Sequence, residues 1–200
     1  FGPDGELLGS YRKIHLFDVD LGPDGPQLRE SRSVRPGTAP VVVDTPLGRI
    51  GLSICYDLRF PELYRSLSAA GAELLLAPSA FTVPTGADHW EVLLRARAIE
   101  NQAYVVAAAQ IGRHTPERRS YGRSLIVDPW GVVLSTCPDR PSVSFAEVDL
   151  DALRARRRAM PCLEHRSEAA LREARILPSA GPDALEAPPS GETPNAHRRR

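Results

Sequence analysis

The chain has 200 residues, of which 42% are hydrophobic and 25% are charged, a composition that excludes collagen-like and fully disordered proteins. Its 25 basic residues balance 25 acidic residues, so no net charge attracts it to nucleic acid or to an anionic membrane surface. No apolar run reaches the roughly 20 residues that a membrane-spanning helix needs. We therefore expect small molecules or proteins as partners, and neither nucleic acid nor a membrane.

Hydrophobic periodicity predicts an alternation of strands and helices along the chain. Strands are expected over 11–16, 41–43, 49–55, 73–78, 103–110, 124–127, 132–134 and 143–148. Helices are expected over 61–71, 88–101 and 152–158. The four prolines and three glycines of 22–40 predict a long loop, with Glu30 in its middle. The fold class is therefore α/β, with parallel strands joined through helices.

The last part of the chain has a different composition. From Pro178 onward Pro, Gly, Ala, Ser and Glu dominate, and there is too little apolar surface to offset the entropy of ordering the segment. We therefore predict a folded domain over 1–177 and a disordered tail over 178–200.

The cysteine content indicates the compartment. Cys55, Cys137 and Cys162 form no short metal-binding pair, and an odd number of cysteines is a poor disulfide framework. Reduced, intracellular thiols and no bound metal are expected. The chain begins at Phe1 and its only methionine is Met160, so we expect a fragment or a processed product, with any targeting peptide upstream.

Cys55 is the candidate nucleophile, because it ends a predicted buried strand and precedes a tight turn into a helix. This order resembles a nucleophile elbow, in which backbone N–H groups converge beside an exposed side chain, and it suits acyl transfer. The alternative is a small buried core residue, as free cysteines often are. A reactive thiol needs a nearby base or cation, and the upstream candidates are Glu30 and Lys13, the only lysine in the chain.

A cysteine–histidine hydrolase is a competing interpretation, with His15, His89 or His114 as the base for Cys55. A catalytic histidine needs an orienting partner, and the sequence reveals none, so we favour lysine. Cys137 and Cys162 lack the context of an elbow and are expected to be ordinary thiols.

Other polar residues have structural interpretations. Asp57 and Arg59 are expected to form a salt bridge that supports the turn after Cys55. The arginines Arg154, Arg156, Arg157 and Arg158 have acidic neighbours, which predicts a solvated helix face rather than a nucleic-acid site.

Two long motifs resemble the nitrilase superfamily of carbon-nitrogen hydrolases. Residues 11–16, Tyr-Arg-Lys-Ile-His-Leu, resemble its lysine motif, and residues 51–62, Gly-Leu-Ser-Ile-Cys-Tyr-Asp-Leu-Arg-Phe-Pro-Glu, resemble its cysteine motif. Residues 89–101, 121–124 and 128–131 resemble the following helix and the closing hairpin. The residues of these motifs are most similar to those of the branch of the superfamily that hydrolyses deaminated glutathione.

This resemblance implies a four-layer αββα sandwich, incomplete at its N-terminus, in which 1–177 is the C-terminal part of the domain. It implies a triad of glutamate, lysine and cysteine, with Cys55 as nucleophile and Lys13 as the cation beside the oxyanion. Glu30 fits a second glutamate that orients the lysine, and the backbone N–H of Tyr56 is a candidate oxyanion donor. No metal and no organic cofactor is implied.

The general base of the family is a glutamate well upstream of the lysine. Only Glu6 precedes Lys13 here, and it does not lie where the family pattern places the base. Two interpretations follow. One is a cytoplasmic, or also mitochondrial, homodimeric amidase that cleaves deaminated glutathione through a cysteine acyl-enzyme. The other is an inactive truncated isoform that binds or dimerises with the full-length enzyme. We expect residues 1–200 alone to be aggregation-prone and to lack amidase activity.

Overall fold

The computed structural model describes residues 1–20, 27–116, 118–167, 169–171 and 174. Phe1–His165 form one compact unit. A second unit begins at Arg166, and its short 3-10 helix η3 (Ala169–Leu171) is described. The predicted disordered tail over 178–200 lies outside the described residues.

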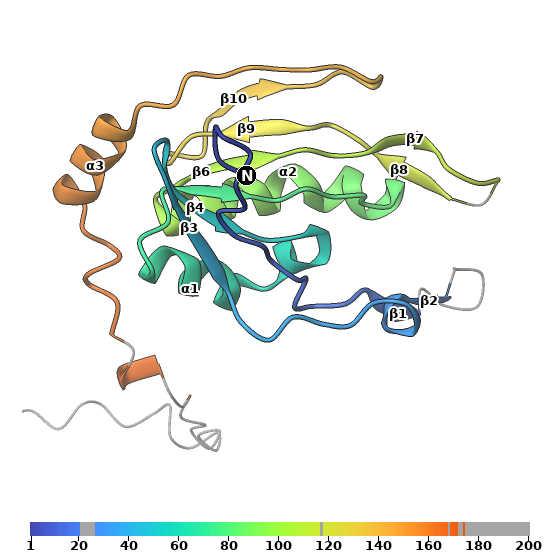
Figure 1. Ribbon diagram of the computed structural model, residues 1–200, viewed down its shortest axis with the longest axis horizontal. Helices are drawn as coiled ribbons and strands as arrows, with labels where there is room; N and C mark the ends of the chain where they lie inside the picture. Colours follow the sequence, from blue (N-terminus) through green and yellow to red (C-terminus); the bar gives the residue numbers. More distant parts are fainter. Residues whose placement is uncertain (21–26, 117, 168, 172–173, 175–200) are drawn as a thin grey trace, which may run out of the picture. The chain divides into compact units, whose positions relative to one another are not determined.

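A six-stranded sheet organises the first unit (Figure 1). Its strands are β3 (Val41–Thr45), β4 (Gly48–Leu52), β5 (Leu74–Leu76), β6 (Tyr104–Ala107), β9 (Leu125–Val127) and β10 (Val133–Thr136). They lie in the order β10-β9-β6-β5-β4-β3, and β4, β5 and β6 are parallel while the other pairs are antiparallel. The segments that follow the parallel strands therefore meet at one edge of the sheet, where ligand sites of α/β folds commonly lie.

Two helices, α1 (Pro61–Ala69) and α2 (Val83–Asn101), cover one face of this sheet. Side chains of a strand alternate between faces, and Leu75, Val105 and Val127 lie on the covered face and are buried. Gly51 lies on the same face. A Cβ atom at Gly51 would lie 3.1 Å from the Cβ of Leu67, so the absent side chain allows α1 to approach the sheet closely.

Most of the predicted elements are confirmed. The strands predicted over 49–55, 73–78 and 103–110 are present in shorter form, and both predicted hairpins of the main sheet form. Helix α2 begins at Val83, five residues before the predicted start at 88, because Pro84 in its first turn is compatible with a helix although the apolar stripe begins later. The hairpin of β7 (Ile111–Arg113) and β8 (Arg119–Tyr121) was not predicted.

The strand predicted over 11–16 is wrong. The nearest strand is β1 (Asp18–Asp20), which pairs with β2 (Gln27–Arg29). The polar backbone groups of 11–16 bond to side chains and to a loop instead of a ladder, as when the His15 N–H donates to the Asp57 carboxylate at 3.0 Å. An alternating pattern does not distinguish these two ways of pairing the backbone.

Two further predictions need correction. The loop predicted over 22–40 contains β2 and the 3-10 helix η1 (Glu30–Arg32), so Glu30 begins a helical turn; residues 21–26 lie outside the described part. The strand predicted over 143–148 is wrong, because this segment joins no ladder of the described residues. Val143 and Phe145 are 76% and 84% exposed, so hydrophobic alternation alone does not make a strand.

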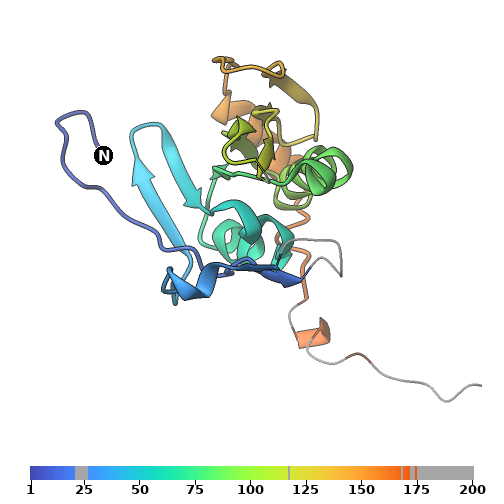
Figure 2. The same ribbon diagram turned by 90° about the vertical axis from the view of Figure 1, so that its right-hand side faces the viewer.

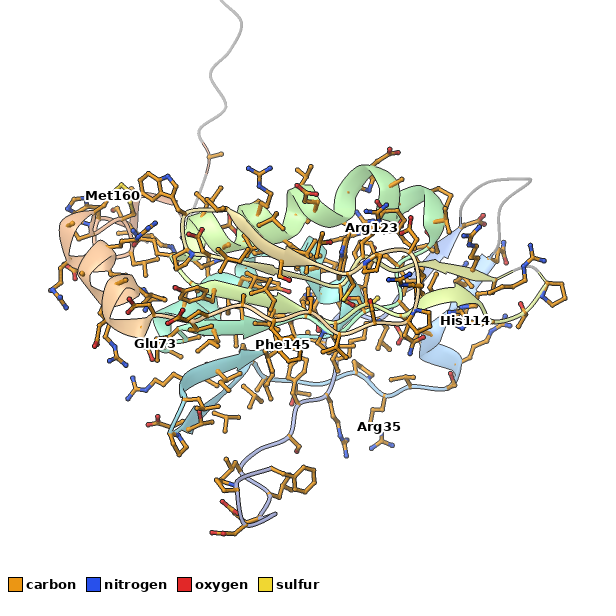
Figure 3. The ribbon with its side chains drawn as sticks, turned by 90° about the horizontal axis from the view of Figure 1, so that it is seen from above. Arg35, Glu73, His114, Arg123, Phe145 and Met160 are labelled. Atoms are coloured by element: carbon orange, nitrogen blue, oxygen red, sulfur yellow. The ribbon has the colours of Figure 1, made fainter. Side chains whose placement is uncertain are left out.

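The solvated face predicted for helix α3 (Leu150–Ala159) is present, because Arg154, Arg156 and Arg158 are exposed, but two of its arginines also bond to the protein body. Arg154 Nε lies 2.7 Å from the Glu73 carboxylate, and Figure 3 shows Glu73 beside this helix. Arg157 donates to the backbone carbonyls of Ala72 and Gln102. Arginine suits this role because its planar fork reaches several acceptors at once.

We predict that Glu73→Gln destabilises the protein in a pH-dependent way. The hydrogen bond from Arg154 is the main reason that the pKa of Glu73 lies below its usual value. The stabilisation is therefore present above the ordinary carboxyl pKa and is lost as the pH falls through the lowered one.

Urea unfolding of the natural full-length protein and of its Glu73→Gln variant at about pH 7 and about pH 3 measures this effect. The difference in the free energy of unfolding should shrink at the lower pH. Asp44→Asn, which removes an exposed carboxylate 3.7 Å from Arg49, is the control and should change little at either pH. A difference of equal size at both pH values would contradict the prediction.

Candidate active site

Cys55 lies on a strained turn at the carboxyl edge of the parallel strands. It begins the 3-10 helix η2 (Cys55–Arg59), and its φ of 50° is in the left-handed region that non-glycine residues rarely adopt. Its N–H donates to the Pro78 carbonyl after β5 at 2.9 Å. The thiol is half-buried and makes no disulfide. This is the geometry expected of a nucleophile elbow, and strain of this kind is concentrated at functional sites.

Buried polar side chains hold the turn that carries Cys55 in place. The Ser53 hydroxyl lies 2.7 Å from the Tyr64 hydroxyl and donates to the Leu76 carbonyl at 2.7 Å. Arg97 donates twice to the Leu58 carbonyl inside η2. Burial raises the pKa of Tyr64, so its hydroxyl stays protonated as a hydrogen-bonding group. The turn is therefore held from both the sheet and α2.

Lys13 is buried, with 7% of its surface exposed, and it pairs with Glu30. Its Nζ lies 2.5 Å from Glu30 Oε2, and the same oxygen accepts the Phe17 N–H at 2.7 Å. A buried ammonium is costly unless a counterion and hydrogen bonds compensate for its lost hydration. A solvated surface lysine is therefore excluded, and the structure brings two of the predicted site residues together.

A glycine loop holds the backbone of the lysine. The Gly37 N–H donates to the Lys13 carbonyl at 2.8 Å. A Cβ atom at Gly37 would lie only 2.1 Å from the Arg12 carbonyl oxygen, so a side chain there would push the two segments apart. The loop over 33–40 thus covers the lysine segment.

The lysine segment packs against the turn that carries Cys55. The His15 ring stacks on Phe60 with centroids 3.6 Å apart, and Phe17 contacts Tyr56 edge-on at 4.9 Å. Figure 2 shows the N-terminal chain (blue) running beneath the helical region (teal) that begins after Cys55. Lys13 therefore lies in a segment whose neighbouring residues contact both ends of η2.

Tyr56, whose backbone N–H is the predicted oxyanion donor, directly follows Cys55 in η2. The N–H groups on either side of it are occupied, because Cys55 donates to Pro78 and Asp57 donates to the Ile54 carbonyl at 3.1 Å. The Tyr56 N–H lies between them, directly after Cys55, in the first turn of η2, where helical N–H groups lack intrahelical acceptors.

The predicted salt bridge between Asp57 and Arg59 is wrong. Asp57 bonds to Tyr11 and His15, while Arg59 lies 5.4 Å from the ring centre of Phe81 and 3.4 Å from His89 Nδ1. Two residues apart in a 3-10 turn, the two side chains leave the helix in different directions. The sequence placed Asp57 inside the cysteine motif but did not reveal its distant partners.

The histidines have other partners than the thiol. His15 Nδ1 bonds to Asp57, and His114 Nε2 lies 2.8 Å from the Ser120 hydroxyl in the β7–β8 hairpin. His89 is exposed beside Arg59. Glu6 is exposed in the N-terminal turn. His15 and His114 thus bond to groups other than the Cys55 thiol.

Within the described part of the chain, no group of three or more His, Cys, Asp or Glu side chains is arranged to hold a metal ion. The helices of this part are also too short or too polar to cross a membrane.

Of the other two thiols, Cys137 is buried and Cys162 is exposed. Hydrogen bonds with Ser142 and Ser144 lower the pKa of Cys137.

We predict that Glu30→Gln destabilises the protein by about 1–3 kcal/mol, because it leaves the Lys13 ammonium buried without a counterion. Urea unfolding of the natural full-length protein and its variants measures the change in the free energy of unfolding. Lys13→Met combined with Glu30→Gln should recover part of the loss, and Glu147→Gln, at an exposed position, is the matched control. Full additivity of the two site substitutions would contradict a coupled pair.

Comparison with known proteins relates this geometry to a family. Residues 1–158 match the carbon-nitrogen hydrolase family. Human deaminated glutathione amidase is 54% identical over 163 residues, which are 81% of this chain and 50% of that protein. The chain thus spans about half the length of the curated relatives it matches.

Solved structures agree with the match. The crystal structure of NitFhit, a nitrilase and fragile histidine triad fusion protein of Caenorhabditis elegans, superposes with a TM-score of 0.79 at 52% identity, over 84% of this chain and 40% of that one. A variant of an amidase from Nesterenkonia sp. superposes with a TM-score of 0.58 at 33% identity, over 69% of this chain and 49% of that one. In that structure the acetamide moiety of fluoroacetamide is covalently added at the active-site cysteine. The predicted nitrilase-type α/β fold is confirmed.

Proposed function

The chain belongs to the carbon-nitrogen hydrolase family, and from this premise we propose that it is the nucleophile-bearing part of an amidase that cleaves linear carbon–nitrogen amide bonds. The observation that carries the proposal is the buried Lys13–Glu30 pair, in a segment packed against the left-handed turn of Cys55. An ammonium fixed in a segment that packs against the turn of a thiol, with an N–H in the first turn of the following helix, is an arrangement suited to acyl transfer.

In the proposed reaction the Cys55 thiolate attacks the amide carbonyl carbon and forms a tetrahedral oxyanion. The carbon–nitrogen bond then breaks, and the amine leaves with the proton that the Cys55 thiol gave up when the thiolate formed, so a thioester on Cys55 remains. Water attacks the thioester, releases the carboxylic acid and restores the thiol. The attack by water passes through a second tetrahedral oxyanion. Lys13 and the Tyr56 N–H stabilise both oxyanions, an effect of about 3–4 kcal/mol for one well-placed donor.

Glu30 acts in this scheme through Lys13. Its carboxylate holds the ammonium in one place and compensates the charge where the side chain is shielded from water. The Phe17 N–H on the same oxygen fixes the carboxylate in turn. The family pattern places the general base upstream of the lysine motif, so these residues supply the nucleophile and the electrostatic stabilisation.

The substrate that we propose is deaminated glutathione, which the name of the human relative specifies for that protein. The Nesterenkonia adduct shows that a relative forms a covalent bond between its active-site cysteine and an acetamide moiety. Both support an amide substrate and a cysteine intermediate for this chain. The alternative is the inactive isoform, which would bind a partner copy and turn over no amide.

Trapping the acyl-enzyme tests this proposal. The natural protein at its full length is incubated with deaminated glutathione, quenched with acid and mapped by peptide mass. We predict the acyl adduct on Cys55, and loss of turnover in Cys55→Ala. Cys162→Ala, which removes an exposed thiol, should retain turnover. Adducts on Cys137 or Cys162, or binding without any adduct, would contradict the proposal, and the second result would favour the inactive isoform.

We predict that Lys13→Arg lowers kcat/KM by about 100-fold or more although it preserves the charge. A wide planar guanidinium does not fit a buried site built for a compact ammonium at 2.5 Å from Glu30. The neighbouring Arg12→Lys, at an exposed position, is the matched control and should leave turnover unchanged. Turnover near that of wild type in Lys13→Arg would show that the ammonium does not face the oxyanion.

A further inference from the structure

The buried carboxylate of Asp57 has more hydrogen bonds than its place in a turn requires. It is fully buried, at 0% exposure. Its Oδ1 accepts the His15 N–H at 3.0 Å and lies 2.8 Å from His15 Nδ1. Its Oδ2 accepts the Tyr11 hydroxyl at 2.8 Å and the Ile54 N–H at 2.9 Å. Each oxygen therefore has two partners.

These partners join two segments that are distant in the sequence. Three of them belong to Tyr11 and His15, which lie two residues before and two residues after Lys13. The fourth belongs to Ile54, the residue before Cys55. One carboxylate thus connects the segment of the lysine to the turn of the thiol.

The network tolerates little displacement. Burial, and then the hydrogen bond to Asp57, raise the pKa of Tyr11, so Tyr11 remains a protonated donor to the carboxylate. A shift of either segment would leave a buried donor or acceptor without a partner, which costs more than a typical hydrogen bond contributes. The position of Lys13 relative to Cys55 is therefore coupled to Asp57.

We propose that Asp57 is a positioning residue that holds Lys13 against the thiol of Cys55. This inference rests on the proposed function, in which the Lys13 ammonium faces that thiol. Asp57 does not touch the reacting atoms in this scheme; it acts through Tyr11, His15 and Ile54.

The direct charge of Asp57 and its positioning effect have opposite signs. A carboxylate near Cys55 disfavours the thiolate, so removing its charge should increase the reactivity of the thiol. A fixed ammonium favours the thiolate, so displacing Lys13 should decrease it. The sign of the change therefore identifies which effect Asp57 exerts.

The test is the rate of Cys55 alkylation by iodoacetamide at about pH 7 in the natural full-length protein, resolved by peptide mass mapping. Lys13→Met should slow alkylation about tenfold. Asp57→Asn should slow it about three- to tenfold while Lys13 is present, and should leave it equal or faster in the Lys13→Met background. Merely structural damage would instead expose Cys55 and the buried Cys137 to faster alkylation in both backgrounds.

Tyr11→Phe is the second variant, because it removes one donor and keeps the Asp57 charge, so it remains informative if Asp57→Asn does not fold. Tyr11→Phe should slow Cys55 alkylation about two- to threefold when Lys13 is present. In the Lys13→Met background it should not slow alkylation. Asp44→Asn, an exposed carboxylate, is the charge control and should have no effect.

The outcomes separate the two proposals. Unchanged or faster alkylation in Asp57→Asn or Tyr11→Phe with Lys13 present, or equal slowing in both backgrounds, overturns the positioning role. A Lys13→Met variant that alkylates at the wild-type rate overturns it as well. If the expected alkylation pattern appears but no amide forms an adduct on Cys55, the positioning role stands and the proposed amidase reaction is wrong.

Discussion

The ion pair between Lys13 and Glu30 is the interaction on which the rest of the site depends. An ammonium with 7% exposure is stable only where a carboxylate and hydrogen bonds replace its water, and Glu30 meets that need at 2.5 Å. The Gly37 N–H holds the lysine backbone, and the Phe17 N–H holds the carboxylate. The surrounding chain thus fixes one positive charge in a shielded position, which is the condition for strong stabilisation of an oxyanion.

The sheet supplies the other half of the site. Because β4 and β5 are parallel, the turn after β4 and the segment after β5 meet at one edge, and the bond from Cys55 N–H to Pro78 fixes them there. The left-handed backbone of Cys55 is the point at which η2 begins. Side-chain hydrogen bonds, and not a strand ladder, then join this edge to the lysine segment.

Local patterns were sufficient to predict the strands of the main sheet, helices α1 and α2, and Cys55 at the end of a buried strand. They failed where partners are distant in the sequence. The segment 11–16 alternates like a strand, but Asp57, 42 residues after His15, takes its N–H. The arginines of α3 bond to carbonyls and carboxylates that lie up to 85 residues away. Periodicity records which face is apolar, but not which polar groups meet across the fold.

A nuclear magnetic resonance measurement on the side-chain nitrogen of Lys13 tests the central claim most directly. These 200 residues contain one lysine, so a lysine-labelled protein gives a Lys13 signal that its loss in Lys13→Arg identifies. The account predicts ammonium protons that exchange slowly with water, and a signal that shifts when iodoacetamide modifies Cys55 but not when it modifies Cys162 in a Cys55→Ala variant. A rapidly exchanging signal that is unaffected by modification of Cys55 would contradict it.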